Sequence, residues 1–84
     1  MIIQLKYFIY DENHFLIMKN LDRILELLQD SNWHGVEEIN NELHLSVDRL
    51  NEAIRFLLEW GLIEKEEETL KITVDGLEYL ELQF

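Results

Sequence analysis

The chain of 84 residues has no cysteine, no proline and only three glycines. Without cysteine there are no disulfides, thiolate metal ligands or thiol catalysis, which is typical of a cytoplasmic protein. So little glycine and no proline exclude collagen-like and linker-rich chains. No apolar run approaches the roughly 20 residues of a membrane span, and Lys6 makes the apolar start a poor signal peptide. The sequence therefore predicts a single small globular domain, residues 1–84, with no membrane partner.

Cations are also scarce, because seven lysines and arginines stand against eighteen acidic residues, for a net charge of −11. Such a charge repels nucleic acid and membrane surfaces at long range. No catalytic triad spacing, glycine-rich phosphate loop or acid/base pair is present. His14, His34 and His44 do not make a metal site, since zinc requires three or four ligands and structural zinc usually requires cysteine. We expect no enzymatic activity, no cofactor and no metal.

The spacing of the apolar residues predicts the secondary structure. Residues 1–10 alternate as a strand does, and a helix follows, unless residues 14–18 form the return strand of a hairpin. After Gly61 the period changes from helical to strand-like. The expected elements are a strand over 1–10, a helix from about Phe15 or Asn20 to about Asp30, helices over 36–43 and 47–60, paired strands over 62–64 and 70–72 joined by an acidic run, and a last short helix after Thr73.

Three small residues mark the expected ends of these helices. Ser46 precedes an apolar-periodic run and is expected to cap the helix over 47–60. Gly61 ends that helix in a left-handed conformation, and Thr73 caps the last helix. Other side chains are expected to point inward: Trp33, the stripe Leu50, Ile54, Leu57 and Leu58, and the residues Val74, Leu77, Leu80 and Leu82 of the last helix.

Two motifs resemble a known family. Leu57-Leu58-Glu59-Trp60-Gly61-Leu62-Ile63 precedes a charged hairpin, and Ile72-Thr73-Val74-Asp75-Gly76-Leu77-Glu78-Tyr79-Leu80 follows it. They resemble the winged helix-turn-helix of small prokaryotic transcription regulators of the MarR, PadR and ArsR type. The resemblance covers residues 20–82. It implies an α+β, mostly helical fold with a three-helix bundle, a β-hairpin wing and a short C-terminal helix over 19–84, preceded by an extension over 1–18.

In that family the third helix enters the major groove and the wing touches the DNA backbone or minor groove. The resemblance therefore implies a DNA-binding transcription regulator with residues 47–60 as the recognition helix. Arg49, Asn51 and Arg55 would do most of the reading. The candidate positions are Ser46, Asp48, Arg49, Asn51, Glu52 and Arg55 on the helix, and Lys65 and Lys71 on the wing.

The charge of these elements favours an alternative. Residues 47–60 carry two arginines against three acidic residues, and residues 62–73 carry two lysines against four, so the sums are −1 and −2. Most DNA readers gain affinity by neutralising phosphates with lysine and arginine. The alternative is a winged-helix protein–protein interaction module that does not bind DNA and docks a basic partner through its acidic wing or an aromatic stripe.

Aromatic residues are the candidates for such an interface. The stripe Ala53, Phe56 and Trp60 packs either inside the monomer or against a partner. The apolar strand over 1–10 either covers a groove of its own chain or pairs across a homodimer. The interface candidates are Tyr7, Phe8, Tyr10, Phe56 and Trp60.

Overall fold

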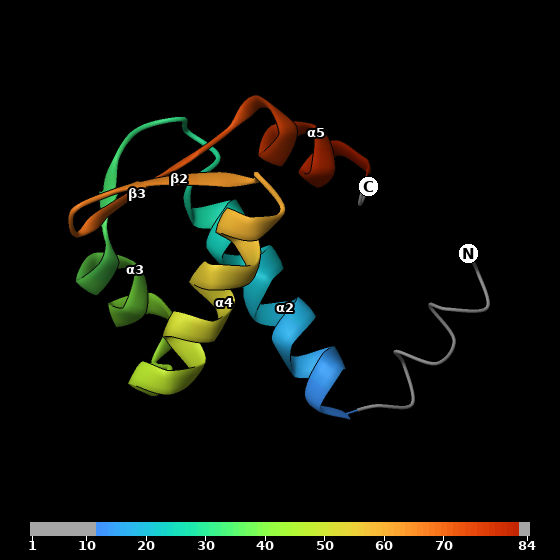
Figure 1. Ribbon diagram of the computed structural model, residues 1–84, viewed down its shortest axis with the longest axis vertical. Coiled ribbons are helices and arrows are strands. Elements are labelled where there is room, and N and C mark those ends of the chain that lie inside the picture. Colours follow the sequence, from blue (N-terminus) through green and yellow to red (C-terminus); the bar gives the residue numbers. More distant parts are fainter. Residues whose placement is uncertain (1–11, 83–84) are drawn as a thin grey trace.

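The computed structural model describes the backbone of residues 12–82 and the side chains of residues 18–82. The strand predicted over 1–10, with the candidates Tyr7, Phe8 and Tyr10, lies outside these residues. Within them the fold is α+β, with four helices and a small three-stranded antiparallel sheet (Figure 1). No helix in the described range is long and apolar enough to cross a membrane. The elements are α2 (Glu12–Leu27), β1 (His34–Gly35), α3 (Val36–Leu43), α4 (Val47–Glu59), β2 (Ile63–Glu66), β3 (Thr69–Ile72) and α5 (Val74–Leu82).

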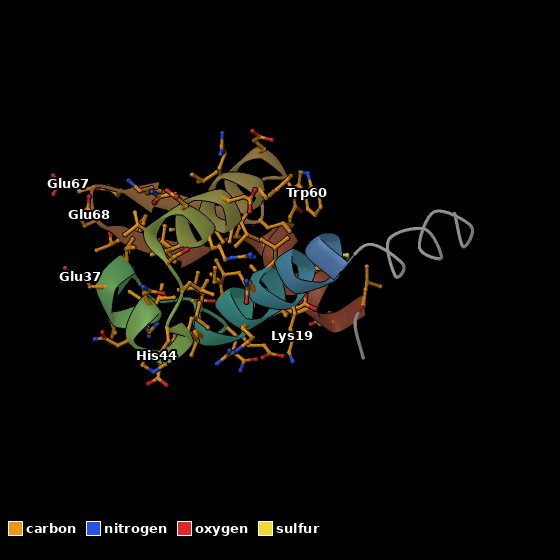
Figure 2. All side chains as sticks on the ribbon, turned by 90° about the horizontal axis from the view of Figure 1, so that it is seen from below. Lys19, Glu37, His44, Trp60, Glu67 and Glu68 are labelled. Atoms are coloured by element: carbon orange, nitrogen blue, oxygen red, sulfur yellow. The ribbon has the colours of Figure 1, made fainter. Side chains whose placement is uncertain are left out.

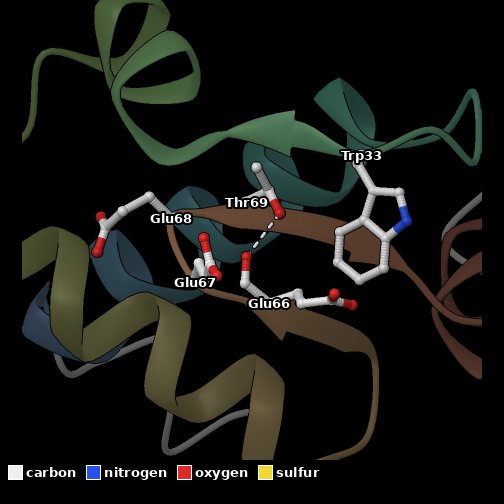
Figure 3. A pocket seen from close by; sticks show the side chains of 5 residues that line it. All are labelled: Trp33, Glu66, Glu67, Glu68 and Thr69. Carbon is white, nitrogen blue, oxygen red and sulfur yellow. Dashed lines mark hydrogen bonds between the residues drawn. The ribbon is translucent and has the colours of Figure 1, made fainter.

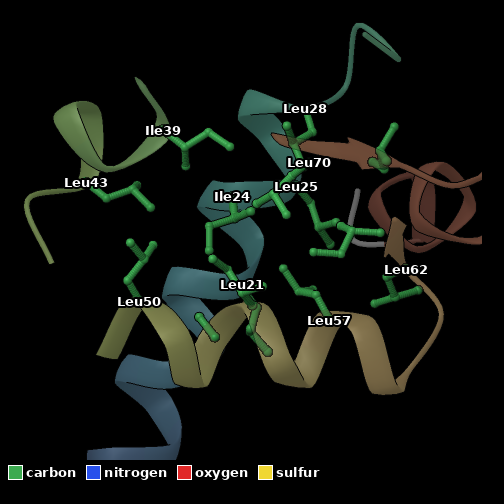
Figure 4. Packing of buried hydrophobic residues seen from close by; sticks show 14 of the residues in the cluster. Leu21, Ile24, Leu25, Leu28, Ile39, Leu43, Leu50, Leu57, Leu62 and Leu70 are labelled. Carbon is green, nitrogen blue, oxygen red and sulfur yellow. The ribbon is translucent and has the colours of Figure 1, made fainter. Parts of the chain in front are cut away.

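The core lies where α2, α3 and α4 meet the inner side of the sheet (Figure 4). On α2 the buried leucines and isoleucine recur three and four residues apart, which gives the helix one continuous apolar face. Leu57 on α4 and Leu70 on β3 are fully buried against it. Each buried leucine side chain contributes about 1.5–3 kcal/mol to folding. The buried residues of the two long helices are Leu21, Ile24, Leu25, Leu50, Ala53, Ile54 and Leu57, and the buried Leu28 follows directly after α2.

A three-residue turn joins α3 to α4. His44 takes a left-handed conformation, with φ 57°, at the end of α3. The Asn40 side chain then clasps the turn, because its amide donates to the Leu45 carbonyl at 3.0 Å and its oxygen accepts from the Leu45 N–H at 2.9 Å. Ser46 Oγ accepts a hydrogen bond from the Arg49 N–H at 3.3 Å, which starts α4 as predicted. Polar side chains therefore fix how the two helices follow each other.

The sheet has the strand order β1-β3-β2, and its base is tied to α5 through Thr73. The Thr73 hydroxyl donates to the Gly61 carbonyl at 2.7 Å and accepts from the Gly76 N–H at 3.0 Å. Gly61 has φ 71°, the left-handed residue expected after α4. At Gly76 an added Cβ would lie 2.3 Å from the Leu62 carbonyl oxygen, so α5 approaches the end of α4 too closely for any larger residue. One hydroxyl and one glycine thus join the hairpin, α4 and α5.

Several predicted boundaries are wrong at the two ends of the described chain. The helix α2 begins at Glu12, earlier than the predicted Phe15 or Asn20, and ends at Leu27, before the predicted Asp30. Residues 14–18 are therefore helical, and the alternative of a return strand is wrong. In α5 only one face packs against the domain. Gly76 and Leu80 are buried, whereas Val74 and Leu82, which were expected to point inward, are 70% and 85% exposed.

The middle of the chain differs from the prediction in the sheet and on α4. The acidic run is mostly strand, since β2 extends from Ile63 to Glu66 and only two residues form the turn. The two-residue strand β1 was not predicted, because its pairing with β3 leaves no local pattern. On α4, the helix ends at Glu59 and Trp60 is its cap, while Leu58, predicted as core, is 38% exposed. The packed side of α4 is narrower than its apolar content suggested.

Candidate functional site

The solvent face of α4 carries most of the candidate DNA contacts. Asp48, Asn51, Arg55 and Glu59 are exposed, and Glu52 is half-buried among them. Arg49 is also exposed, but two residues of helix turn it about 160° away from Asn51. The three predicted reading residues therefore do not share one face. Arg55 stands alone among three carboxylates.

Arg55 lines a shallow hollow of about 270 Å³ together with Glu52, Phe56 and Glu59. Among described residues, no carboxylate lies within ion-pair distance of Arg55 or Arg49. The guanidinium of Arg55 is thus available to a ligand, although its surroundings are acidic. Ser46 contributes less to such a surface, because its hydroxyl already caps α4.

Lys65 and Lys71, the two candidate wing lysines, lie on opposite faces of the β2–β3 hairpin. Lys65 on β2 pairs with the buried Leu70, so its side chain lies on the inner side of the hairpin. It is nevertheless exposed to solvent, because it lies close to the turn of the hairpin. Lys71 pairs with Glu64 on the outer side. Its ammonium lies 5.7 Å from the ring centroid of Trp33, a cation–π contact. The outer lysine therefore contacts an aromatic ring on the outer side of the hairpin.

Trp33 is 42% exposed, so the prediction that it fills the core is wrong. It immediately precedes β1, on the outer side of the sheet, where Gly35 pairs with Thr69. The core is instead formed mainly by leucines and isoleucines from the helices and the hairpin. We refer to Trp33, Glu64, Glu66, Thr69 and Lys71 as the outer sheet face.

A hollow of about 390 Å³ opens on this face between Trp33, Thr69 and the acidic tip, the name we give to Glu66, Glu67 and Glu68 (Figure 3). The Thr69 hydroxyl donates to the Glu66 carbonyl at 2.7 Å, which closes the turn. The Val36 N–H donates to the Glu68 carbonyl at 2.9 Å and ties the tip to the segment that carries Trp33. All three tip carboxylates are exposed. These bonds hold the backbone of the hollow, and in Figure 3 the Glu66 side chain extends toward Trp33 whereas that of Glu68 points away from it.

Trp60 is the second exposed tryptophan, at 54%, and it makes an edge-to-face contact with the half-buried Phe56, with ring centroids 5.9 Å apart. Of the predicted stripe, Ala53 is buried, so the stripe packs inward at one end and reaches solvent at the other. Figure 2 shows Trp60 well away from Glu67 and Glu68. The two tryptophans thus belong to separate surfaces.

His34, next to Trp33, lies between two carboxylates. Its Nε2 is 2.9 Å from an Asp30 oxygen and its Nδ1 is 3.4 Å from a Glu38 oxygen. The hydrogen bond to Asp30 raises the pKa of His34, with a smaller contribution from Glu38, and the same bond lowers the pKa of Asp30. Within the described residues, no group of three or more potential ligands could hold a metal ion. The contacts of His34 with Asp30 and Glu38 link the loop before β1 to the start of α3.

Sequence reasoning found both lysines and the acidic run, but it missed the contact of Trp33 with the hairpin. The only signal was composition, namely an aromatic residue between the polar Asn32 and His34. Comparison with known proteins adds no relative: no protein-family model, no curated protein and no solved structure matches this chain.

Proposed function

We propose that this chain is a winged helix-turn-helix domain that works as a protein-interaction module and binds a partner with a basic surface. The order of the elements supports the winged-helix assignment. Two helices joined by a tight turn, α3 and α4, are followed by a β-hairpin and a short last helix. Such folds serve both as DNA readers and as protein-docking modules, so the surface must decide between these functions.

The observation that carries the proposal is the exposure of Trp33 beside the acidic tip. Tryptophan is enriched among the residues that dominate protein interfaces, and exposed apolar patches mark interaction sites. The carboxylates around Trp33 favour a partner of positive charge. On a winged helix that bound DNA, this same hairpin would bring four glutamates toward phosphates.

A second candidate function is DNA binding through α4, the function that the family resemblance implies. The observation in its favour is that Asn51 and Arg55 are exposed one helical turn apart, with no described carboxylate paired to Arg55. Asparagine and arginine side chains can recognise adenine and guanine edges. Against it stands the net charge of −11, which leaves few cations to neutralise phosphates.

Two titrations of the same protein separate these functions. Fluorescently labelled random duplex DNA and a labelled peptide in which arginine alternates with glycine are each followed by anisotropy, at about 20 and about 150 mM salt. We expect the peptide to bind at the higher salt and the duplex to bind at neither. A peptide in which glutamine replaces arginine is the control, and it should not bind.

Salt-sensitive binding of the duplex, lost on Arg55→Ala, would instead establish the DNA reader. A protein using three phosphate contacts loses about 500-fold in affinity for a tenfold rise in salt. Failure of the arginine peptide to bind at about 150 mM salt would overturn the interaction module, whatever the duplex does.

A further inference from the structure

The geometry points to the hollow between Trp33 and the acidic tip as the docking site for a basic, extended segment of a partner protein, with one arginine or lysine side chain held against the indole. This inference rests on the proposed function and gives it a location. This hollow combines an exposed aromatic ring, a concave shape and side-chain charge of one sign.

The chain itself already places a cation on this indole. The ammonium of Lys71 lies 5.7 Å from the ring centroid, in the range where cation–π attraction operates. Lys71 is half-buried on the outer sheet face, and its ring contact leaves the three carboxylates of the acidic tip without a described cation within ion-pair distance. An incoming side chain would therefore meet the tip carboxylates and compete with Lys71 for the ring.

Charge complementarity selects the occupant. The outer sheet face together with the tip carries one lysine against four glutamates, a sum of −3, so the occupant is cationic. A second copy of this chain brings another −11 and would be repelled. A small metal ion would use only the carboxylates, and the indole would remain unused. A guanidinium or ammonium on a flexible stem fits both the ring and the carboxylates.

The site can be tested directly because the chain has two tryptophans. Trp60→Phe leaves Trp33 as the sole indole, so its fluorescence reports on the hollow. Titration with the arginine–glycine peptide should shift and saturate the Trp33 emission. The opposite single-tryptophan protein, Trp33→Phe, should show no change in Trp60 emission. A response of Trp60 with none of Trp33 would overturn this site while leaving the interaction module standing.

Substitution of the acidic tip tests the contribution of its charges. We expect the triple change Glu66→Gln, Glu67→Gln, Glu68→Gln to weaken peptide binding about tenfold. A matched triple on α5, Asp75→Asn, Glu78→Gln and Glu81→Gln, removes the same net charge from exposed positions elsewhere and should weaken binding by no more than about twofold. Equal losses in both triples would mean diffuse attraction to an acidic protein and would overturn the site.

The two lysines of the hairpin provide a test of opposite sign. Removing the internal competitor by Lys71→Gln should strengthen peptide binding about threefold, because the ring is released and a positive charge on the same face is removed. Lys65→Gln changes the net charge equally on the other face of the hairpin and should have a smaller effect. Peptide affinity that is unchanged in Lys71→Gln, or strengthened more in Lys65→Gln, contradicts a site on the outer sheet face.

Discussion

The solvent face of α4 and the outer sheet face are both acidic, but they are built in different ways. The face of α4 comes from a single stretch of chain, and it depends only on the cap at Ser46 and the buried leucines beneath it. The outer sheet face is assembled from three segments, around Trp33, along β2 and along β3. It is fastened at one end by the bond from Val36 to Glu68 and at the other by Thr73.

This difference indicates which changes each surface tolerates. A surface carried by one helix survives as long as that helix is packed and capped. A surface assembled from distant segments also depends on every contact that aligns them. Substitutions at the base of the hairpin should therefore damage the hollow at Trp33 while α4 keeps its structure, and substitutions at the cap of α4 should do the reverse.

The largest effect is expected from Gly76→Ala. The added methyl group would lie 2.3 Å from the Leu62 carbonyl oxygen and 2.6 Å from a side-chain carbon of Ile72, so backbone must move. We expect a loss of about 3 kcal/mol in the free energy of unfolding, measured by urea denaturation. Amide hydrogen exchange should accelerate first in β3 and α5, and α4 should remain protected.

Gly61→Ala is the matched control for this change. Its Cβ would meet no atom within 4 Å, and only the left-handed backbone with φ 71° is unfavourable for alanine. The expected loss is about 1 kcal/mol. If Gly76→Ala lost no more free energy of unfolding than Gly61→Ala, α5 would be able to move away without cost. The outer sheet face would then not depend on the close contact of α5 with Leu62.

These anchors also explain what could be predicted from the sequence. The limits of α3 were predicted correctly, and α4 was predicted to within one residue, because apolar spacing, Ser46 and Gly61 are local signals. The caps at Ser46 and Thr73 were predicted for the same reason. The strand β1 and the exposure of Trp33 depend on pairing with Thr69 and Leu70, far along the chain, so no local pattern contained them.

The burial of single apolar residues was predicted least well. Val74, Leu82 and Leu58 are hydrophobic and periodic, yet they are exposed. Periodicity gives the direction of a side chain on its helix, but a neighbouring element must also be there to cover it. The divergence of Arg49 and Asn51, by contrast, follows from helical periodicity alone, because two residues of helix place them on different sides of α4.

Thr73→Val should have the next largest effect. Valine keeps the shape of threonine but removes the hydroxyl that donates to the Gly61 carbonyl and caps α5 at Gly76. Leaving both groups without this partner should cost about 2 kcal/mol in the free energy of unfolding. Thr73→Ser keeps the hydroxyl and should lose less than half as much. Arginine-peptide affinity should fall in the valine variant, since the base of the hairpin is loosened.

Ser46→Ala tests the other surface. The hydroxyl accepts one hydrogen bond, from the Arg49 N–H, at the start of α4. Its loss should lower the free energy of unfolding by about 1 kcal/mol, and Ser46→Asp should restore most of it. Trp33 fluorescence and peptide affinity should not change. Weaker peptide binding in the alanine variant, with the aspartate variant normal, would mean that α4 shares the site.

The smallest expected effect, and the only one that depends on pH, concerns the contact of His34 with Asp30 and Glu38 beside Trp33. These carboxylates raise the pKa of His34 in the folded protein above its ordinary 6.5.

A raised folded-state pKa stabilises the fold fully below pH 6.5, and the stabilisation is lost as the pH rises through the folded-state pKa. Urea denaturation of wild type and His34→Gln should therefore differ most below pH 6.5, and the difference should shrink as the pH rises through the folded-state pKa of His34. Asp30→Asn should weaken the same pH dependence, because it removes the nearer carboxylate. A difference between wild type and His34→Gln that is constant or grows with pH would mean that the imidazole acts by packing, and that charge does not hold the Trp33 segment in place.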